Sequence, residues 1–202
     1  MEIITLTDDY TFASNCYIIL SGDSFSVVDP SVSYQKAEKV IPELKKYRSG
    51  YVLLTHGHAD HFWEIQSYVN VGCEVLITEH DARIVADKNL NCAALFGEHL
   101  TYNGEYRAIN DGQILKVGEV EFKVMQTPGH TEGSVCYIAD GFAFTGDTLF
   151  ANGGYGRFDL PSGNIVRLKE SLNKLFALDE NIKIYSGHGP ETTLGETKSF
   201  FR

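Results

Sequence analysis

Hydrophobic residues fall into short continuous runs along this chain, and polar or glycine-containing segments separate the runs. Short apolar runs bounded in this way favour strands whose two faces are both buried. The pattern predicts strands at residues 2–6, 16–20, 25–29, 51–55, 74–78, 113–117, 120–127, 134–139, 142–146 and 182–186.

Other segments have the spacing of helices. In residues 33–46 the apolar side chains recur at helical spacing and fall on one face. Residues 164–177 repeat that spacing, and shorter helices are expected at 61–69, with Asp60 as the helix cap, and at 80–87. Residues 88–111 show little periodicity and receive no assignment.

The order of these elements predicts the fold class. Strands cluster, a helix follows, and the same pattern recurs in the second half of the chain. Two β-sheets covered by helices fit this order, which is an α+β four-layer αβ/βα sandwich over a single domain at 1–202. A doubly wound sheet fits less well, because the hairpin-like stretch 113–146 interrupts regular βαβ alternation.

Composition narrows the class of protein. The chain has 202 residues, is 43% hydrophobic and carries a formal net charge of −10. An acidic chain repels nucleic acid and anionic membranes, so neither is an expected partner. The first residues do not resemble a secretory signal, and no apolar run approaches the ~20 residues that span a bilayer. The four cysteines form no CxxC pair, which favours free thiols in the cytoplasm.

Histidine and aspartate gather after the predicted strand at 51–55. His56 and His58 are two residues apart, so on an extended backbone their side chains point the same way. Gly57 between them permits unusual backbone dihedrals. Asp60 and His61 follow where the chain turns into a helix, so their side chains diverge. This segment can therefore contribute ligands to two neighbouring metals.

Three further residues of the same kind each follow a strand and a glycine. They are His130, Asp147 and His188. If these strand ends meet at one edge, five histidines and two aspartates gather there, and such nitrogen and oxygen ligands suit zinc-like ions. Asp147 can bridge two metals because a carboxylate has two oxygens. His80 and His99 stand apart from this pattern and are expected to be structural.

The motifs HGHADH, PGHTEGS, GDTLF and SGHGPET occur in this order and together resemble the metallo-β-lactamase superfamily, over nearly the whole chain. The resemblance implies an αββα sandwich with a dinuclear site at one edge. One metal is then expected to bind His56, His58 and His130, and the other Asp60, His61 and His188, with Asp147 bridging them. Zinc is the expected metal, and iron or manganese also suits these ligands.

Within that superfamily, GDTLFANGGYGRFDLPSG is most similar to short glyoxalase II-like hydrolases. This resemblance implies hydrolysis of a small-molecule acyl-thioester by a hydroxide that bridges the two metals. Asp60 is expected to bind metal and to accept a hydrogen bond from the nucleophile. Full glyoxalase II adds a C-terminal helical domain that is not expected here, and Gly156-Arg157-Phe158 replaces its glutathione-binding pattern. Hydroxyacylglutathione is therefore a model for the substrate rather than an assigned one.

Three residues outside the ligand set are further candidates for the site. Asp29 ends a predicted strand and either orients a ligand histidine or forms a turn before Pro30. Tyr155 and Arg157 follow Asp147 on a glycine-rich loop and can hold a polar part of the substrate. Arg157 can equally pair with Asp159 or with a ligand carboxylate.

Other functions remain open at this point. A mononuclear iron persulfide (sulfur) dioxygenase has the same motifs and holds its iron by two histidines and one aspartate. A non-catalytic scaffold is disfavoured because all seven ligand positions are intact. A flavodiiron-type redox module needs a flavin domain, which is not expected in this chain.

Overall fold

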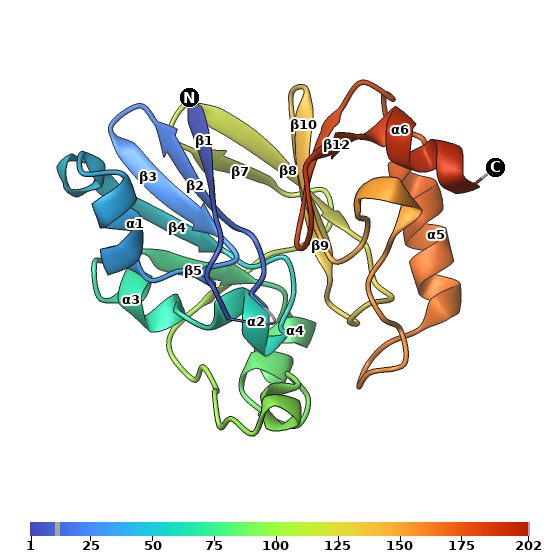
Figure 1. Ribbon diagram of the computed structural model, residues 1–202, viewed down its shortest axis with the longest axis horizontal. Helices are drawn as coiled ribbons and strands as arrows, with labels where there is room; N and C mark the ends of the chain where they lie inside the picture. The colour runs from blue at the N-terminus through green and yellow to red at the C-terminus, as the bar shows by residue number, and fades with distance from the viewer. Residues whose placement is uncertain (11–12, 202) are drawn as a thin grey trace.

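Two six-stranded sheets form the centre of the computed structural model, which describes residues 1–10 and 13–201 (Figure 1). In the first sheet, β1 to β6 neighbour one another in chain order. These strands are β1 (Glu2–Leu6), β2 (Cys16–Ser21), β3 (Ser24–Val28), β4 (Arg48–Leu53), β5 (Glu74–Ile77) and β6 (Arg107–Ala108). The strands from β3 to β6 are parallel, so their carboxyl ends lie at the same edge.

The second sheet has the order β12-β11-β10-β9-β8-β7. Its strands are β7 (Ile114–Val117), β8 (Val120–Gln126), β9 (Val135–Ala139), β10 (Phe142–Gly146), β11 (Lys183–Ser186) and β12 (Thr192–Thr193). Strands β10 and β11 are parallel, and β8 runs in the same direction because β9 is antiparallel to both β8 and β10. The carboxyl ends of β8, β10 and β11 therefore lie together as well.

Helices cover the outer faces of both sheets. The first sheet carries α1 (Tyr34–Val40) and α3 (Ile65–Val69), and the second carries α5 (Ile165–Leu175) and α6 (Leu194–Lys198) (Figure 1). The short helices α2 (Ala59–Phe62) and α4 (Glu79–Val85) lie at the edge where the parallel strands end. The predicted four-layer sandwich is confirmed. No helix among residues 1–10 and 13–201 is long and apolar enough to cross a membrane.

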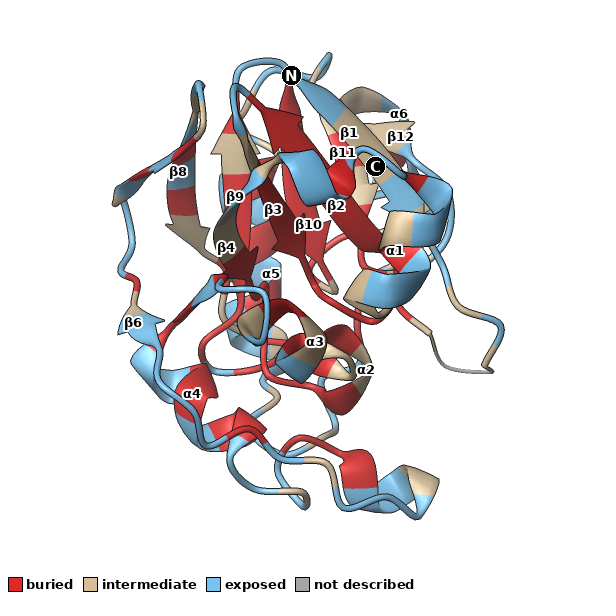
Figure 2. Ribbon diagram, turned by 90° about the vertical axis from the view of Figure 1, so that its left-hand side faces the viewer, coloured by how far each residue is buried: buried red, intermediate tan, exposed pale blue. Residues whose placement is uncertain are grey.

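The main core lies between the two sheets, and Figure 2 shows the strands that enclose it as mostly buried. Phe122, Tyr137 and Phe144 of the second sheet pack there against Val28 and Leu53 of the first. Such a close-packed core has little room to rearrange, so the strand ends that leave it are held in fixed positions.

Two predicted helices differ from the structure. The helix expected at 33–46 ends at Val40, because Pro42 lacks an N–H and disfavours helical dihedrals at Ile41, and a 3-10 turn, Leu44–Lys46, follows. The helix expected at 61–69 is divided into α2 and α3. Asp60 does not cap it: the cap position belongs to His58, and Asp60 lies in the first turn.

Short elements at residues 88–111 and near the C-terminus are not predicted by the sequence pattern. Residues 88–111 contain a 3-10 turn, Ala93–Phe96, and the two-residue strand β6. Strand β12 and helix α6 lie beyond the last predicted strand, and the 3-10 turns Ala151–Gly153 and Ser199–Phe201 complete the elements. Each of these is shorter than the window in which periodicity can be detected.

Candidate metal centre

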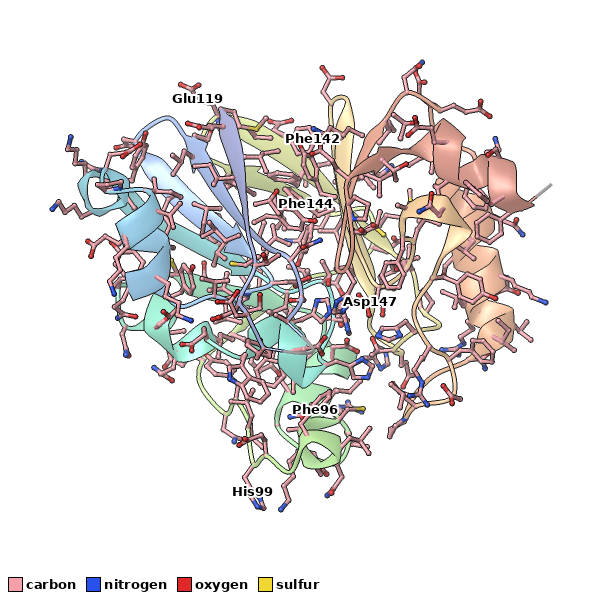
Figure 3. All side chains as sticks on the ribbon, viewed as in Figure 1. Phe96, His99, Glu119, Phe142, Phe144 and Asp147 are labelled. Atoms are coloured by element: carbon pink, nitrogen blue, oxygen red, sulfur yellow. The ribbon has the colours of Figure 1, made fainter. Side chains whose placement is uncertain are left out.

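The seven candidate ligands all lie at the edge where parallel strands of both sheets end. His56, His58, Asp60 and His61 follow β4, and His130, Asp147 and His188 follow β8, β10 and β11. Their side chains form three overlapping groups in which one ligand atom per residue lies within 4.8 Å of the others. Figure 3 shows Asp147 at this edge, between the two halves of the molecule. The structure therefore brings together all seven residues that the sequence selects.

His56, His58 and His130 form the first group. Nε2 of His130 lies 2.8 Å from Nδ1 of His58 and 3.2 Å from Nε2 of His56. All three residues are buried. Burial and the neighbouring histidines lower the pKa of His56 well below its usual value and that of His58 to about 3. The imidazoles of His56 and His58 are therefore neutral and can offer nitrogen lone pairs to a cation.

Asp60, His61 and His188 form a second group beside it. Oδ2 of Asp60 lies 3.2 Å from Nε2 of His188 and 3.5 Å from Nε2 of His61. Asp147 lies between the two groups, with Oδ1 3.3 Å from Nε2 of His61 and Oδ2 3.5 Å from Nε2 of His130. Although burial would raise the pKa of Asp147, its electrostatic interactions with His61, His130 and His188 lower it. Its carboxylate is therefore ionised and in contact with both groups.

Hydrogen bonds determine which nitrogen of each histidine faces the centre. Thr55 donates its hydroxyl proton to Asp29 Oδ2 (2.7 Å), so it accepts one from Nδ1 of His56 at 3.1 Å. His130 donates from Nδ1 to the carbonyl oxygen of Arg157 at 2.6 Å. His61 likewise donates from Nδ1 to Asp29 Oδ2 at 2.9 Å. When these three imidazoles are neutral, the lone pair of each is left on Nε2, which is the atom that points into the cluster.

Several buried atoms at the centre have no hydrogen-bond partner in the described part of the chain. They include Nε2 of His61 and Oδ1 of Asp147, which face each other at 3.3 Å without hydrogen-bond geometry. An unsatisfied buried polar atom typically costs about 1–3 kcal/mol. A cation would satisfy both atoms at once and would separate the close imidazole nitrogens. The donor set is therefore consistent with a dinuclear metal site.

Asp29 satisfies both of its sequence interpretations. It takes a positive φ of 51° directly before Pro30, as a turn residue does. It is also buried, and its oxygens accept from Nδ1 of His61, from the hydroxyl of Thr55 and from the backbone N–H of Thr55 at 2.8 Å. The contact that would orient His61 is present. Its effect on metal binding stays a prediction.

A cavity of about 1020 Å³ opens over the candidate metal centre. Tyr155 and Arg157 line it, but the Arg157 guanidinium is exposed and donates twice to Asp159, at 2.9 and 2.8 Å. Of the two ion pairs expected for Arg157, the one with Asp159 is present, and its role in holding the substrate stays a prediction. Most of the remaining wall is apolar, from Tyr10, Trp63, Cys92, Leu95, Phe96, Phe150 and Leu160.

Neither this apolar wall nor one buried carboxylate is predicted by the sequence. Leu95 and Phe96 belong to the 88–111 segment, and Figure 3 shows Phe96 facing the edge at which Asp147 lies. Asp81 on α4 is fully buried and contacts the loops of His58 and His130. An acidic residue among the buried positions of a short helix was the only signal for Asp81 in the sequence.

His80 and His99 lie outside the cluster. The side chain of His80 is half exposed, with Nδ1 3.7 Å from Glu132. His99 contacts Lys88 on the surface at 2.7 Å and lies far from Asp147 in Figure 3. Neither histidine can contribute a ligand to the centre.

Comparison with known proteins identifies the family of these motifs. The family model of the metallo-β-lactamase superfamily matches residues 9–188. A hydroxyacylglutathione hydrolase, GloC of Haemophilus influenzae, is 33% identical over 98% of this chain and 94% of its own length. A probable metallo-hydrolase, YqgX of Bacillus subtilis, is 33% identical over 89% of this chain and 86% of its own. An uncharacterised Aquifex aeolicus protein is 31% identical over 93% and 90%.

Solved structures share the arrangement. BLEG-1, a B3 metallo-β-lactamase, has a TM-score of 0.86 at 28% identity and covers 98% of this chain and 97% of its own. TTHA1623 in a di-iron-bound form has a TM-score of 0.81 at 27% identity, with the same coverage. ETHE1 from Myxococcus xanthus has a TM-score of 0.76 at 25% identity and covers 98% and 82%.

Proposed function

Because the chain belongs to the metallo-β-lactamase superfamily, we propose that it is a metal-dependent hydrolase that cleaves an acyl-thioester. The observation that carries this proposal is the position of Asp147 between two ligand groups. One carboxylate oxygen faces His61 and the other faces His130. A carboxylate in this position can hold two cations at a short, fixed separation, as two-metal hydrolases require.

The residues divide into two sets around Asp147. His56, His58 and His130 would hold one divalent cation, and Asp60, His61 and His188 the other. Two cations bound there would supply an activated water at neutral pH and would polarise an acyl carbonyl. Although burial would raise the pKa of Asp60, His61 and His188 lower it, and the ionised Asp60 would accept a hydrogen bond from the attacking oxygen and so orient it. Zinc suits the imidazole-rich set, and iron is the alternative that the di-iron-bound relative supports.

The thioester substrate is supported by the similarity to GloC, whose name describes hydrolysis of hydroxyacylglutathione. The residues that line the cavity indicate which kind of thiol the substrate carries. Glutathione carries two carboxylates, whereas the charged residues lining the cavity, apart from the candidate ligands, are Glu98 and the already paired Arg157. Apolar walls favour uncharged groups. We therefore propose a small-molecule thioester with an uncharged thiol as the preferred substrate.

One experiment tests the reaction class. Purified protein is analysed for metal, reconstituted with zinc or iron, and assayed with lactoylglutathione and with lactoyl esters of uncharged thiols. Two metals per chain and hydrolysis of any of these esters support the proposal, and no hydrolysis by the two-metal protein contradicts it. One iron per chain together with oxygen uptake on glutathione persulfide would instead support the persulfide dioxygenase.

A further inference from the structure

The buried carboxylate of Asp81 joins the two loops that carry the first ligand group. Its Oδ2 accepts hydrogen bonds from the backbone N–H of Gly57 and from the hydroxyl of Thr131, both at 2.7 Å. Its Oδ1 accepts from the backbone N–H of Gly133 at 2.8 Å. Gly57 separates His56 from His58, and Thr131 directly follows His130. We propose that Asp81 is a positioning residue that fixes these three histidines relative to one another.

The backbone of both loops comes unusually close to α4. A Cβ atom on Gly133 would collide with the Asp81 carboxylate and the Thr78 hydroxyl, and one on Gly57 would lie 2.9 Å from Ile84. Since only glycine fits at such separations, the loops are docked on the helix by direct backbone contact. Asp81 supplies the acceptors that this contact needs, because both N–H groups would otherwise be buried without partners.

The loop of His130 is held by further hydrogen bonds around the same carboxylate. The Thr131 hydroxyl, which donates to Asp81, accepts from the Ser134 hydroxyl at 2.7 Å. Ser134 in turn accepts from the backbone N–H of Thr131 at 3.1 Å, and Thr78 donates to the carbonyl of Gly133 at 2.9 Å. A connected network of this kind is rigid, and loss of its central acceptor affects every member.

The second ligand group is held by a different carboxylate. Asp29 accepts from His61, and the hydrogen bonds of Asp81 reach no residue of the set Asp60, His61 and His188. The side chain of Asp81 thus bonds only to backbone and hydroxyl groups beside the three histidines, whereas Asp29 bonds directly to His61 and reaches His56 through Thr55. The different effect of Asp81 on the two halves presupposes the proposed two-metal site. It is measured by metal binding and not by hydrolysis.

The test is the metal affinity of each half in full-length protein carrying Asp81→Asn. Asparagine keeps the volume of the side chain but replaces one acceptor oxygen with a donor that faces an N–H or a hydroxyl. We expect the zinc affinity of the three-histidine half to fall about 10–100-fold, as for other residues that orient metal ligands. The affinity of the other half should change less than threefold. Stepwise affinities come from chelator competition, and anomalous diffraction from zinc shows which half is occupied.

Matched variants keep the result interpretable. Glu79→Gln alters an exposed carboxylate on the same helix, bonded to Tyr106 at 3.1 Å, and should leave both affinities unchanged. If Asp81→Asn does not fold, Thr131→Val removes one of the same bonds and Thr131→Ser retains it, so only the valine variant should weaken the three-histidine half. Equal loss from both halves, or unchanged affinities in folded Asp81→Asn, would overturn the assignment. Wild-type protein that binds no metal pair would instead contradict the proposed function.

Discussion

Nδ1 of His61 donates a hydrogen bond to Oδ2 of Asp29 at 2.9 Å, although Asp29 follows β3 and His61 lies on α2, which follows β4. The bond directs Nε2 of His61 toward Asp60 and Asp147. We expect Asp29→Asn, which tolerates the positive φ at this position, to lower the metal affinity of the half formed by Asp60, His61 and His188 about 10–100-fold. Chelator competition measures this loss, and unchanged affinity at that half would contradict it.

Asp147 should be indispensable because it is the residue that contacts both halves. We expect Asp147→Ala to abolish thioester hydrolysis, with kcat falling at least about 10³-fold through loss of the bridging carboxylate. Steady-state assays with lactoyl thioesters, accompanied by metal analysis of the same sample, measure the effect. Normal turnover with metal content unchanged would refute the role proposed for Asp147.

Gly187 and Gly189 flank His188 and provide a matched pair. A Cβ atom at Gly187 would meet the Asp147 carboxylate and lie 2.6 Å from the His61 ring, whereas one at Gly189 would meet nothing within 4 Å. We expect Gly187→Ala to displace ligands and to lower metal affinity and hydrolysis at least about tenfold. Gly189 has φ +81°, so Gly189→Ala should cost about 1–2 kcal/mol of stability while the metal content is preserved.

Thermal unfolding and metal analysis of these two alanine variants separate the two effects. In Gly189→Ala the strain acts on the backbone of the loop. In Gly187→Ala the added methyl group crowds the ligands themselves. Equal metal loss in both variants would show that the loop conformation, rather than the space beside Asp147, controls the centre.

Leu95 and Leu90 both belong to the segment 88–111, but of the two only Leu95 lines the cavity. Both are partly exposed, at 68% and 38%, so their replacement should leave the fold intact. We expect Leu95→Ser to lower kcat/KM for the lactoyl ester of benzyl mercaptan roughly tenfold, because apolar contact with the thiol is lost. Leu90→Ser should have no effect. A higher kcat/KM for lactoylglutathione than for the benzyl ester in wild-type protein would contradict the uncharged thiol.

The sequence could predict the strands and the gathering of the ligands because both follow from local patterns. Continuous apolar runs indicate buried strands, and ligand-type residues such as His130 and His188 each follow a strand and a glycine. Asp81 and Phe96 could not be assigned in this way. Asp81 acts through backbone N–H groups of distant loops, and Phe96 reaches the cavity from a segment without periodicity. Their positions depend on tertiary docking, which periodicity does not encode.

Asp81 should also produce a distinctive dependence of stability on pH in chelator-treated protein. Burial raises the pKa of Asp81 to about 6, although hydrogen bonds from Thr131, Gly57 and Gly133 favour the ionised form. A folded-state pKa above the unfolded value of 3.8 means that the folded protein binds more protons between these limits. The stability contributed by this group is therefore complete below about pH 4 and is lost as the pH rises through about 6.

Asp81→Asn removes this titration. The free energy of unfolding of wild-type protein, relative to that of Asp81→Asn, should accordingly fall by roughly 2 kcal/mol between pH 4 and pH 7. Urea unfolding of both proteins across this range measures the difference, and Glu79→Gln serves as the control whose difference from wild type should stay constant. A relative stability that instead rises with pH would mean that the three donors outweigh burial and keep Asp81 ionised throughout, since a carboxyl with a lowered pKa stabilises the folded chain only above its unfolded value.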